Sequence, residues 1–133
     1  MLFRSHQWGQ GTDWQQLVSV AGKFGQKWKI VTFPMTKVGF IKGKDAIVAR
    51  LKSGSPVIID ILEEASSTSA HSIVICGYDP KTAEFLSRNS ALPFPGFQVF
   101  PEERLKTIWR SRGFIPNNSI MQRPMIVMDR AGK

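Results

Sequence analysis

The chain has 133 residues and a formal net charge of +8, with 42% hydrophobic and 21% charged residues. This length and composition suit one globular domain, residues 1–133, whose core needs neither disulfide bonds nor metal ions. The single cysteine, Cys76, excludes an internal disulfide bond, and one cysteine with two histidines lacks the spacing of a metal site, so we expect no cofactor.

Neither a membrane span nor a secretion signal is recognisable in the sequence. No apolar stretch approaches the ~18 residues that a span requires. The first residues, MLFRSHQWGQGTDW, lack the apolar core of a signal peptide. These features favour the cytoplasm.

The positive charge is concentrated in the first half of the chain. Residues 1–60 hold nine Lys and Arg against three Asp and Glu, whereas residues 61–133 hold nine against seven. A basic half can attract nucleic acid, an acidic protein or anionic lipid. The lysines are scattered and not interleaved with aromatic residues, which favours a solvated basic face over a nucleic-acid site.

The first half of the chain predicts a helix, a strand and a second helix. The first helix is expected over about residues 13–24, ended by Gly25. Its apolar face, at helical spacing, consists of Trp14, Leu17, Val18, Ala21 and Phe24. A short strand follows at about 29–33, stopped by Pro34, and the second helix at about 44–52.

Three strands are predicted next, at about 56–62, 71–78 and 83–88. The turn residues DPKT at 79–82 make the last two strands a hairpin, so the three form an antiparallel meander. Cys76, in the middle of the second of these strands, is expected to be a small buried core residue. Asp60, in the first, is interpreted as a partner for one of the lysines.

The last part of the chain predicts a loop, a helix and a strand. Residues 89–98 are rich in Pro and Gly and are expected to form the loop. A helix begins at Pro101 and runs to about Arg112, with Leu105, Ile108 and Trp109 on its buried face. A final strand is expected at 124–128. The order of elements predicts an α+β fold.

Three short stretches carry the most specific signal: GSPV at 54–57, HSIVICGY at 71–78 and RNS at 88–90. Together they resemble papain-like cysteine peptidases, and more closely the bacterial branch that includes the bacteriocin-leader-processing peptidases. The resemblance is good over residues 54–128 and loose over 11–53. It implies a papain-like fold, with helices packed on an antiparallel sheet, and cleavage of peptide or amide bonds.

The resemblance implies that His71 is the catalytic base and Asn89 the residue that orients it. Pairing of the two strands about the 79–82 turn supports this independently, because it brings His71 and Asn89 to the same open end of the hairpin. An imidazole at the start of a strand, held by a second polar side chain, suits a general base.

The cysteine nucleophile of these peptidases has no evident counterpart. Cys76 lies five residues beyond His71 along one strand, roughly 16 Å away, which is too far for attack with that base. Either the fold is truncated at its N-terminus, or residues 7–14 are a degenerate nucleophile segment. In the second case Asp13 occupies the cysteine position and Gln7 the oxyanion position. Truncation is favoured because the second alternative depends on four matching residues.

Both alternatives predict a peptidase-type domain that is catalytically incomplete and retains a peptide-binding cleft. Its expected partner is a peptide or protein, and a truncated domain would self-associate or pair with a complementing chain. The alternative is a small basic protein without enzymatic activity that acts as an inhibitor or binds nucleic acid or another acidic partner.

Overall fold

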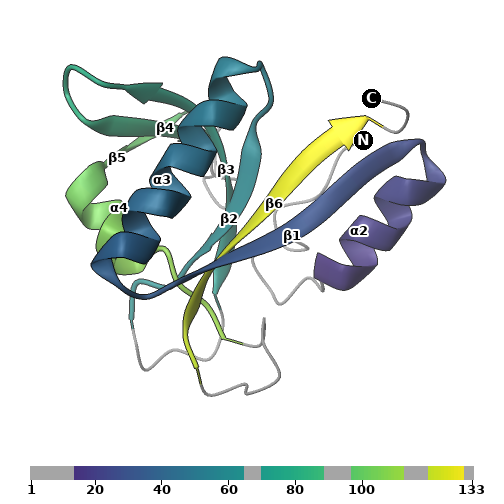
Figure 1. The fold of residues 1–133 in the computed structure, drawn as a ribbon, viewed down its shortest axis with the longest axis horizontal. Coiled ribbons are helices and arrows are strands. Elements are labelled where there is room, and N and C mark those ends of the chain that lie inside the picture. The colour runs from purple at the N-terminus through teal and green to yellow at the C-terminus, as the bar shows by residue number, and fades with distance from the viewer. Residues whose placement is uncertain (1–13, 65–69, 89–96, 113–119, 131–133) are drawn as a thin grey trace.

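The computed structural model describes residues 14–64, 70–88, 97–112 and 120–130, which form three helices and a six-stranded sheet (Figure 1). The strand order is β1-β6-β2-β3-β4-β5, and all neighbours are antiparallel. In chain order the elements are α2 (Trp14–Lys23), β1 (Gln26–Pro34), α3 (Lys37–Lys52), β2 (Val57–Ile61), β3 (His71–Asp79), β4 (Glu84–Arg88), β5 (Gln98–Pro101), α4 (Glu102–Ile108) and β6 (Gln122–Arg130). The predicted α+β fold is confirmed.

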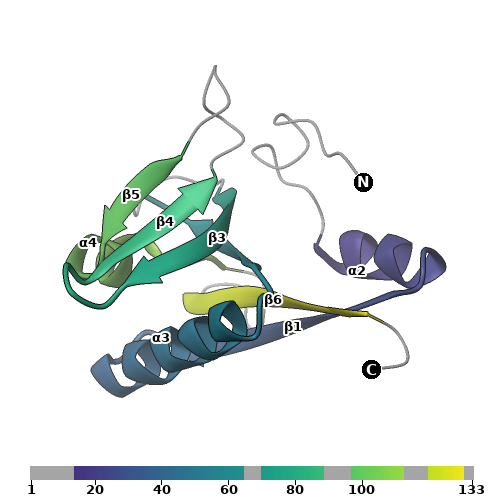
Figure 2. The ribbon, with the colours of Figure 1, turned by 90° about the horizontal axis from the view of Figure 1, so that it is seen from above.

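Helices cover both faces of the sheet, with α2 and α3 on opposite sides of the β1–β6 pair (Figure 2). Side chains alternate between the two faces along a strand. Ile58 of β2 and Ile126 of β6 therefore pack with Trp14 of α2, while their neighbours Ile59 and Met125 face the larger core under α3 and α4. This double cover explains why every residue of β2 is buried. None of the described helices is long and apolar enough to cross a membrane.

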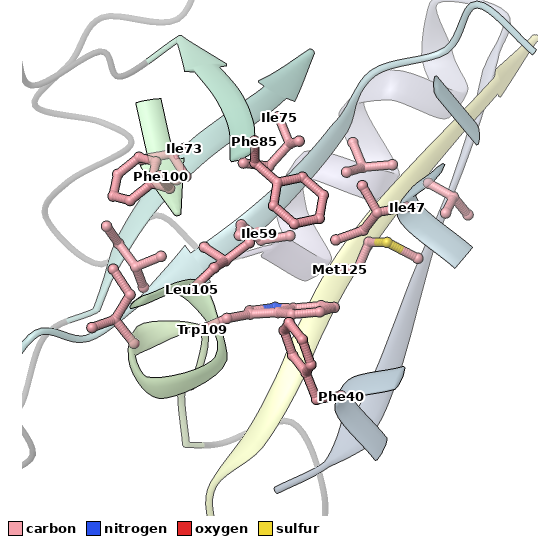
Figure 3. Close-up of a cluster of buried hydrophobic side chains, with 14 residues drawn as sticks. Phe40, Ile47, Ile59, Ile73, Ile75, Phe85, Phe100, Leu105, Trp109 and Met125 are labelled. Atoms are coloured by element: carbon pink, nitrogen blue, oxygen red, sulfur yellow. The ribbon is translucent and has the colours of Figure 1, made fainter. Parts of the chain in front are cut away.

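The larger core is centred on Trp109, which is fully buried just beyond the end of α4 (Figure 3). Its indole Nε1–H donates to the carbonyl oxygen of Pro124 at 2.8 Å. The rings of Phe33 and Phe40 meet it edge-on, with centroids 5.9 and 6.4 Å away. Trp109 also forms an isolated antiparallel bridge with Ile61. One residue thus connects β2, β6, α3 and α4.

Two glycines allow α3 to lie close to this core. A Cβ on Gly43 would lie 2.7 Å from the ring of Trp109, and a Cβ on Gly39 would lie 2.1 Å from the carbonyl oxygen of Pro34. The same glycines lower the helix propensity of this stretch, which is why the predicted start at residue 44 was wrong. The helix begins at Lys37, where the hydroxyl of Thr36 accepts a hydrogen bond from the Gly39 N–H at 2.9 Å.

Other sequence expectations were only partly right. The first helix ends at Lys23, one residue before its predicted end, and Gly25 follows with φ +75°. Phe24, predicted on the apolar face, is 72% exposed because it lies beyond the last helical residue. β1 is longer than predicted because it pairs with β6 over nine residues. Residues 98–101, divided in the prediction between a loop and a helix start, form β5, which pairs with β4. α4 ends at Ile108, four residues before its predicted end.

Cys76 is exposed, so its prediction as a buried core residue was wrong. The register between β3 and β4 shifts between Ile75 and Gly77, which places Cys76 in a β-bulge. A bulge inserts an extra residue into one strand and interrupts the alternation of side chains. The local signal of this shift is Gly77, because a glycine inside a strand often marks a bulge.

The buried Arg123 of β6 fastens the turn between β1 and α3 to α4. Its guanidinium donates to the carbonyl oxygens of Pro34 at 2.7 Å, Thr36 at 3.0 Å and Lys106 at 3.0 Å. It also lies over the ring of Phe40, 5.3 Å from the centroid. Burial lowers the pKa of Arg123. Carbonyl oxygens, which carry partial negative charge, stabilise this buried cation.

A second polar contact joins α3 to the start of α4 and to β3. Lys44 Nζ lies 2.7 Å from Glu102 Oε1, which also accepts a hydrogen bond from the Tyr78 hydroxyl at 3.0 Å. The hydrogen bond with Glu102 raises the pKa of Lys44, and the same contact lowers the pKa of Glu102. Both shifts favour the charged pair at neutral pH.

Gly43→Ala is expected to destabilise the protein by about 1–3 kcal/mol, because the new methyl group must displace the Trp109 ring. The gain in helix propensity, about 1 kcal/mol, offsets part of this cost. Gly22→Ala in α2 is the matched control, since no atom lies within 4 Å of its new Cβ, and it should be neutral or stabilising. Chemical denaturation measures both. Equal stability of the two variants would exclude close packing as the reason for Gly43.

Glu102→Gln is expected to lower the free energy of unfolding at pH 7 by about 1 kcal/mol, because it removes the charge that Lys44 and Tyr78 contact. The contact with Lys44 lowers the pKa of Glu102 in the folded state, so its contribution is present above the ordinary glutamate pKa of 4.5 and disappears as the pH falls through the folded-state pKa. The two proteins should therefore converge in acid. Glu63→Gln, which removes the more exposed pair with Arg104, should change little and serves as the control.

Candidate functional site

His71, the predicted catalytic base, is the first residue of β3 and is half-buried. It pairs with Ile61 at the end of β2, so the pairing of β3 with β2 fixes its backbone. A catalytic histidine requires this combination of a fixed backbone and an accessible ring. Its assignment as the base stays a prediction.

The other predicted site residues, Gln7, Asp13 and Asn89, lie outside the described residues. Asn89 follows Arg88, the last residue of β4, which pairs with Val74 three residues into β3. The hairpin that motivates pairing Asn89 with His71 is therefore present. The hydrogen bond between the two side chains stays a prediction.

Cys76 is poorly suited to act as a nucleophile. Its Sγ lies 3.6 Å from the carbonyl oxygen of Leu86, on the β-bulge. Partial burial raises the pKa of the thiol, and this outweighs the opposite effect of Arg88. Because the thiolate is the reactive form, a raised pKa makes the thiol less reactive at neutral pH. Cys76 is also five positions away from His71 along β3.

A buried polar chain lies beside His71 on the face covered by α2. The carboxyl group of Asp60, in β2, accepts a hydrogen bond from the Ser72 hydroxyl at 2.5 Å. The Ser72 hydroxyl in turn accepts from the indole Nε1–H of Trp14 at 3.2 Å. All three residues are buried. Trp14 is the first residue of α2 and Ser72 follows His71, so this chain joins the start of α2 to the start of β3.

The interpretation of Asp60 as a lysine partner was wrong, since its carboxyl group is buried and bonded to a serine. Burial raises its pKa to about 6, and hydrogen bonds from Ser72 and Ser111 and the charge of His71 oppose this rise. A carboxyl group half-ionised near pH 6 beside a histidine is typical of functional sites as well as of structural networks. The signal in the sequence was one acidic residue inside an otherwise apolar strand.

The arrangement brings together a histidine, a buried carboxyl group and the start of a helix. A papain-like peptidase requires its cysteine at the start of a helix that faces the histidine, because the helix dipole and the imidazole both stabilise the thiolate. Within the described residues no cysteine other than Cys76 is present. The position that corresponds to the missing cysteine nucleophile is therefore expected among the residues that precede α2.

Comparison with known proteins identifies the family. The sequence profile of the Peptidase_C39 like family matches residues 6–116, which include α2, His71 and α4. A comparison with curated proteins finds no match. The antiparallel sheet with helices packed on it is consistent with a papain-like peptidase fold. The chain therefore belongs to the Peptidase_C39 like family, within the superfamily of papain-like cysteine peptidases.

Proposed function

We propose that the protein is a peptidase-type domain that has lost its nucleophile and binds an extended peptide or protein segment beside His71. The observation that carries this proposal is the hydrogen bond from Trp14 to Ser72, because it joins the start of α2 to the neighbour of His71. In a papain-like peptidase these two places supply the nucleophile and the base. We place the protein with the bacteriocin-leader-processing branch, whose active members cut a leader peptide.

We further propose that a degenerate nucleophile segment, and not the truncation that the sequence favours, explains the missing cysteine. The family match begins at residue 6 and so includes Gln7 and Asp13 together with His71. Asp13 directly precedes Trp14, whose side chain reaches Ser72. A carboxylate at the cysteine position cannot form the thioester through which these peptidases act. We accordingly propose Asp13 as the degenerate nucleophile, Gln7 as the former oxyanion donor, His71 as the former base and Asn89 as its orienter.

A second candidate function is binding of an acidic partner, such as nucleic acid. Three lysines that are exposed at the junction of α2 and β1 favour it: Lys23, Lys27 and Lys29. Phe24, also exposed, lies among them. Such a surface binds through charge, so its affinity would fall steeply as salt displaces counterions.

Restoring a cysteine tests the site directly. In a Cys76→Ser background, Asp13→Cys should give a thiol whose pKa lies at least ~1 unit below the ~8.5 of free cysteine, because the helix start and His71 stabilise the thiolate. The pH dependence of alkylation by iodoacetamide measures this pKa. His71→Ala should return it toward the ordinary value. Ser19→Cys, at an exposed position of the same helix, is the matched control. An ordinary pKa at position 13, unaffected by His71, would contradict the proposal.

Peptide binding separates the two candidate functions. Fluorescence anisotropy with a pool of labelled, uncharged 15-residue peptides should show binding that His71→Ala weakens about tenfold, equivalent to ~1.4 kcal/mol. Added salt should change this affinity little. Lys81→Ala, in the turn at the opposite end of β3, should have no effect. Binding that is instead restricted to acidic ligands, abolished by salt and insensitive to His71 would favour the basic surface.

A further inference from the structure

The buried carboxyl group of Asp60 requires an explanation beyond packing. It is 8% exposed, within a strand whose other residues are all apolar and buried. Burying a carboxylate costs free energy even when it is hydrogen-bonded. An aliphatic side chain at this position would avoid that cost and extend the apolar strand. The carboxyl group is therefore better explained by the residues that its hydrogen bonds position than by a contribution to stability.

Asp60 holds two elements that are distant in the sequence. Its carboxyl group binds Ser72, 12 residues away in β3, and Ser72 binds Trp14, 58 residues away in α2. The apolar contacts of Trp14 with Ile58 and Ile126 attach α2 to the sheet, but such contacts have no preferred direction. A hydrogen bond has a direction, and it fixes the position of the helix start along β3.

We propose that Asp60 is a positioning residue, which acts through Ser72 and Trp14 to hold the start of α2 at the start of β3, beside His71. The docking contact stands on its own, and only the role of His71 rests on the proposed function. For that function the contact sets the separation between the segment before α2 and the histidine, and therefore whether the two act on the same bound peptide.

The groups around Asp60 act on the ionisation of its carboxyl group. His71 is the titratable group whose charge acts on the carboxyl group, and hydroxyl groups face it from β3 and from Ser111. The guanidinium group of Arg110, the residue before Ser111, donates to the carbonyl oxygens of Leu62 and Glu63. A test of Asp60 must therefore be controlled for His71.

Ionisation of Asp60 should change the strength of the hydrogen bond that the Trp14 indole donates. Because the pKa of Asp60 is about 6, the carboxyl group ionises within an accessible pH range. An ionised carboxylate is the stronger acceptor, and it polarises the Ser72 hydroxyl so that this hydroxyl accepts more strongly from the indole. The hydrogen bond of Trp14 should thus strengthen as the pH rises through 6.

The experiment follows the indole N–H resonances of the full ¹⁵N-labelled chain between pH 4.5 and 8, with Trp14 assigned by Trp14→Phe. The Trp14 proton should move downfield with a midpoint near pH 6. Asp60→Asn and Ser72→Ala should each abolish this movement, while His71→Gln should retain it. The indole of Trp109, bonded to a backbone carbonyl oxygen, is the internal reference and should not follow this transition.

Two results would overturn the proposal. The first is a Trp14 resonance that does not move in the wild type. The second is a movement that persists in Asp60→Asn or Ser72→Ala, and in particular one that disappears in His71→Gln. Ser72→Ala keeps the buried charge, so the test remains decisive if Asp60→Asn fails to fold. An Asp13→Cys thiol of ordinary pKa would contradict the proposed function while leaving the Trp14 result unaffected, so the two failures are distinguishable.

Stability against pH gives an independent measurement. Burial raises the pKa of Asp60 from the ordinary 3.8 to about 6 in the fold, so between these pH values the folded protein binds one more proton than the unfolded chain. The stability contributed by this proton is present below pH 3.8 and is lost as the pH rises through 6. Asp60→Asn should unfold at a higher urea concentration than the wild type at pH 7, and the difference should close near pH 4. A constant difference would contradict a buried ionisation at this position.

Discussion

The arrangement of α3 and α4 on the sheet depends on the burial of one indole, that of Trp109. Its N–H binds the carbonyl oxygen of Pro124, while its ring fills the space under α3. A tryptophan combines a large apolar area with one donor that must be satisfied when buried. Here the donor fixes the end of α4 to β6, and the ring sets the distance of α3 from the sheet. The absence of a side chain at Gly43 follows from this constraint.

Different interactions attach the helices to the two faces of the sheet. Under α3 and α4 the core is apolar, and close packing determines how the elements fit. Under α2 the apolar cluster is small and is extended by the polar chain of Trp14, Ser72 and Asp60. Such a chain contributes less to stability than an apolar core of the same size, but it specifies one orientation. In the proposed function, the start of α2 must lie at a defined distance from His71, and the polar chain lies on that same face of the sheet.

Membership of a peptidase family and peptidase activity are separate properties, because a fold supports a reaction only when the reacting groups are present. The one cysteine is exposed on a β-bulge, and partial desolvation of its thiol raises the thiol pKa and so disfavours the thiolate. In the proposed function, the start of α2 and the start of β3, joined by the hydrogen bond from Trp14 to Ser72, are the places of the nucleophile and the base. A site of this kind can bind a peptide without cleaving it, since binding requires shape and hydrogen bonds and not a nucleophile.

The sequence by itself determined the order of the elements other than β5, the meander of β2, β3 and β4 and the position of His71 at a strand start, because hydrophobic periodicity and turn residues are local properties. The tertiary structure alone decided the rest. Gly39 and Gly43 are helical because of what α3 packs against, β5 is a strand because β4 pairs with it, and Cys76 is exposed because two strands lose register at the bulge. The hydrogen-bond partners of Asp60 likewise could not be predicted from the sequence. These bonds connect residues far apart along the chain and form only when β2, β3 and α2 meet.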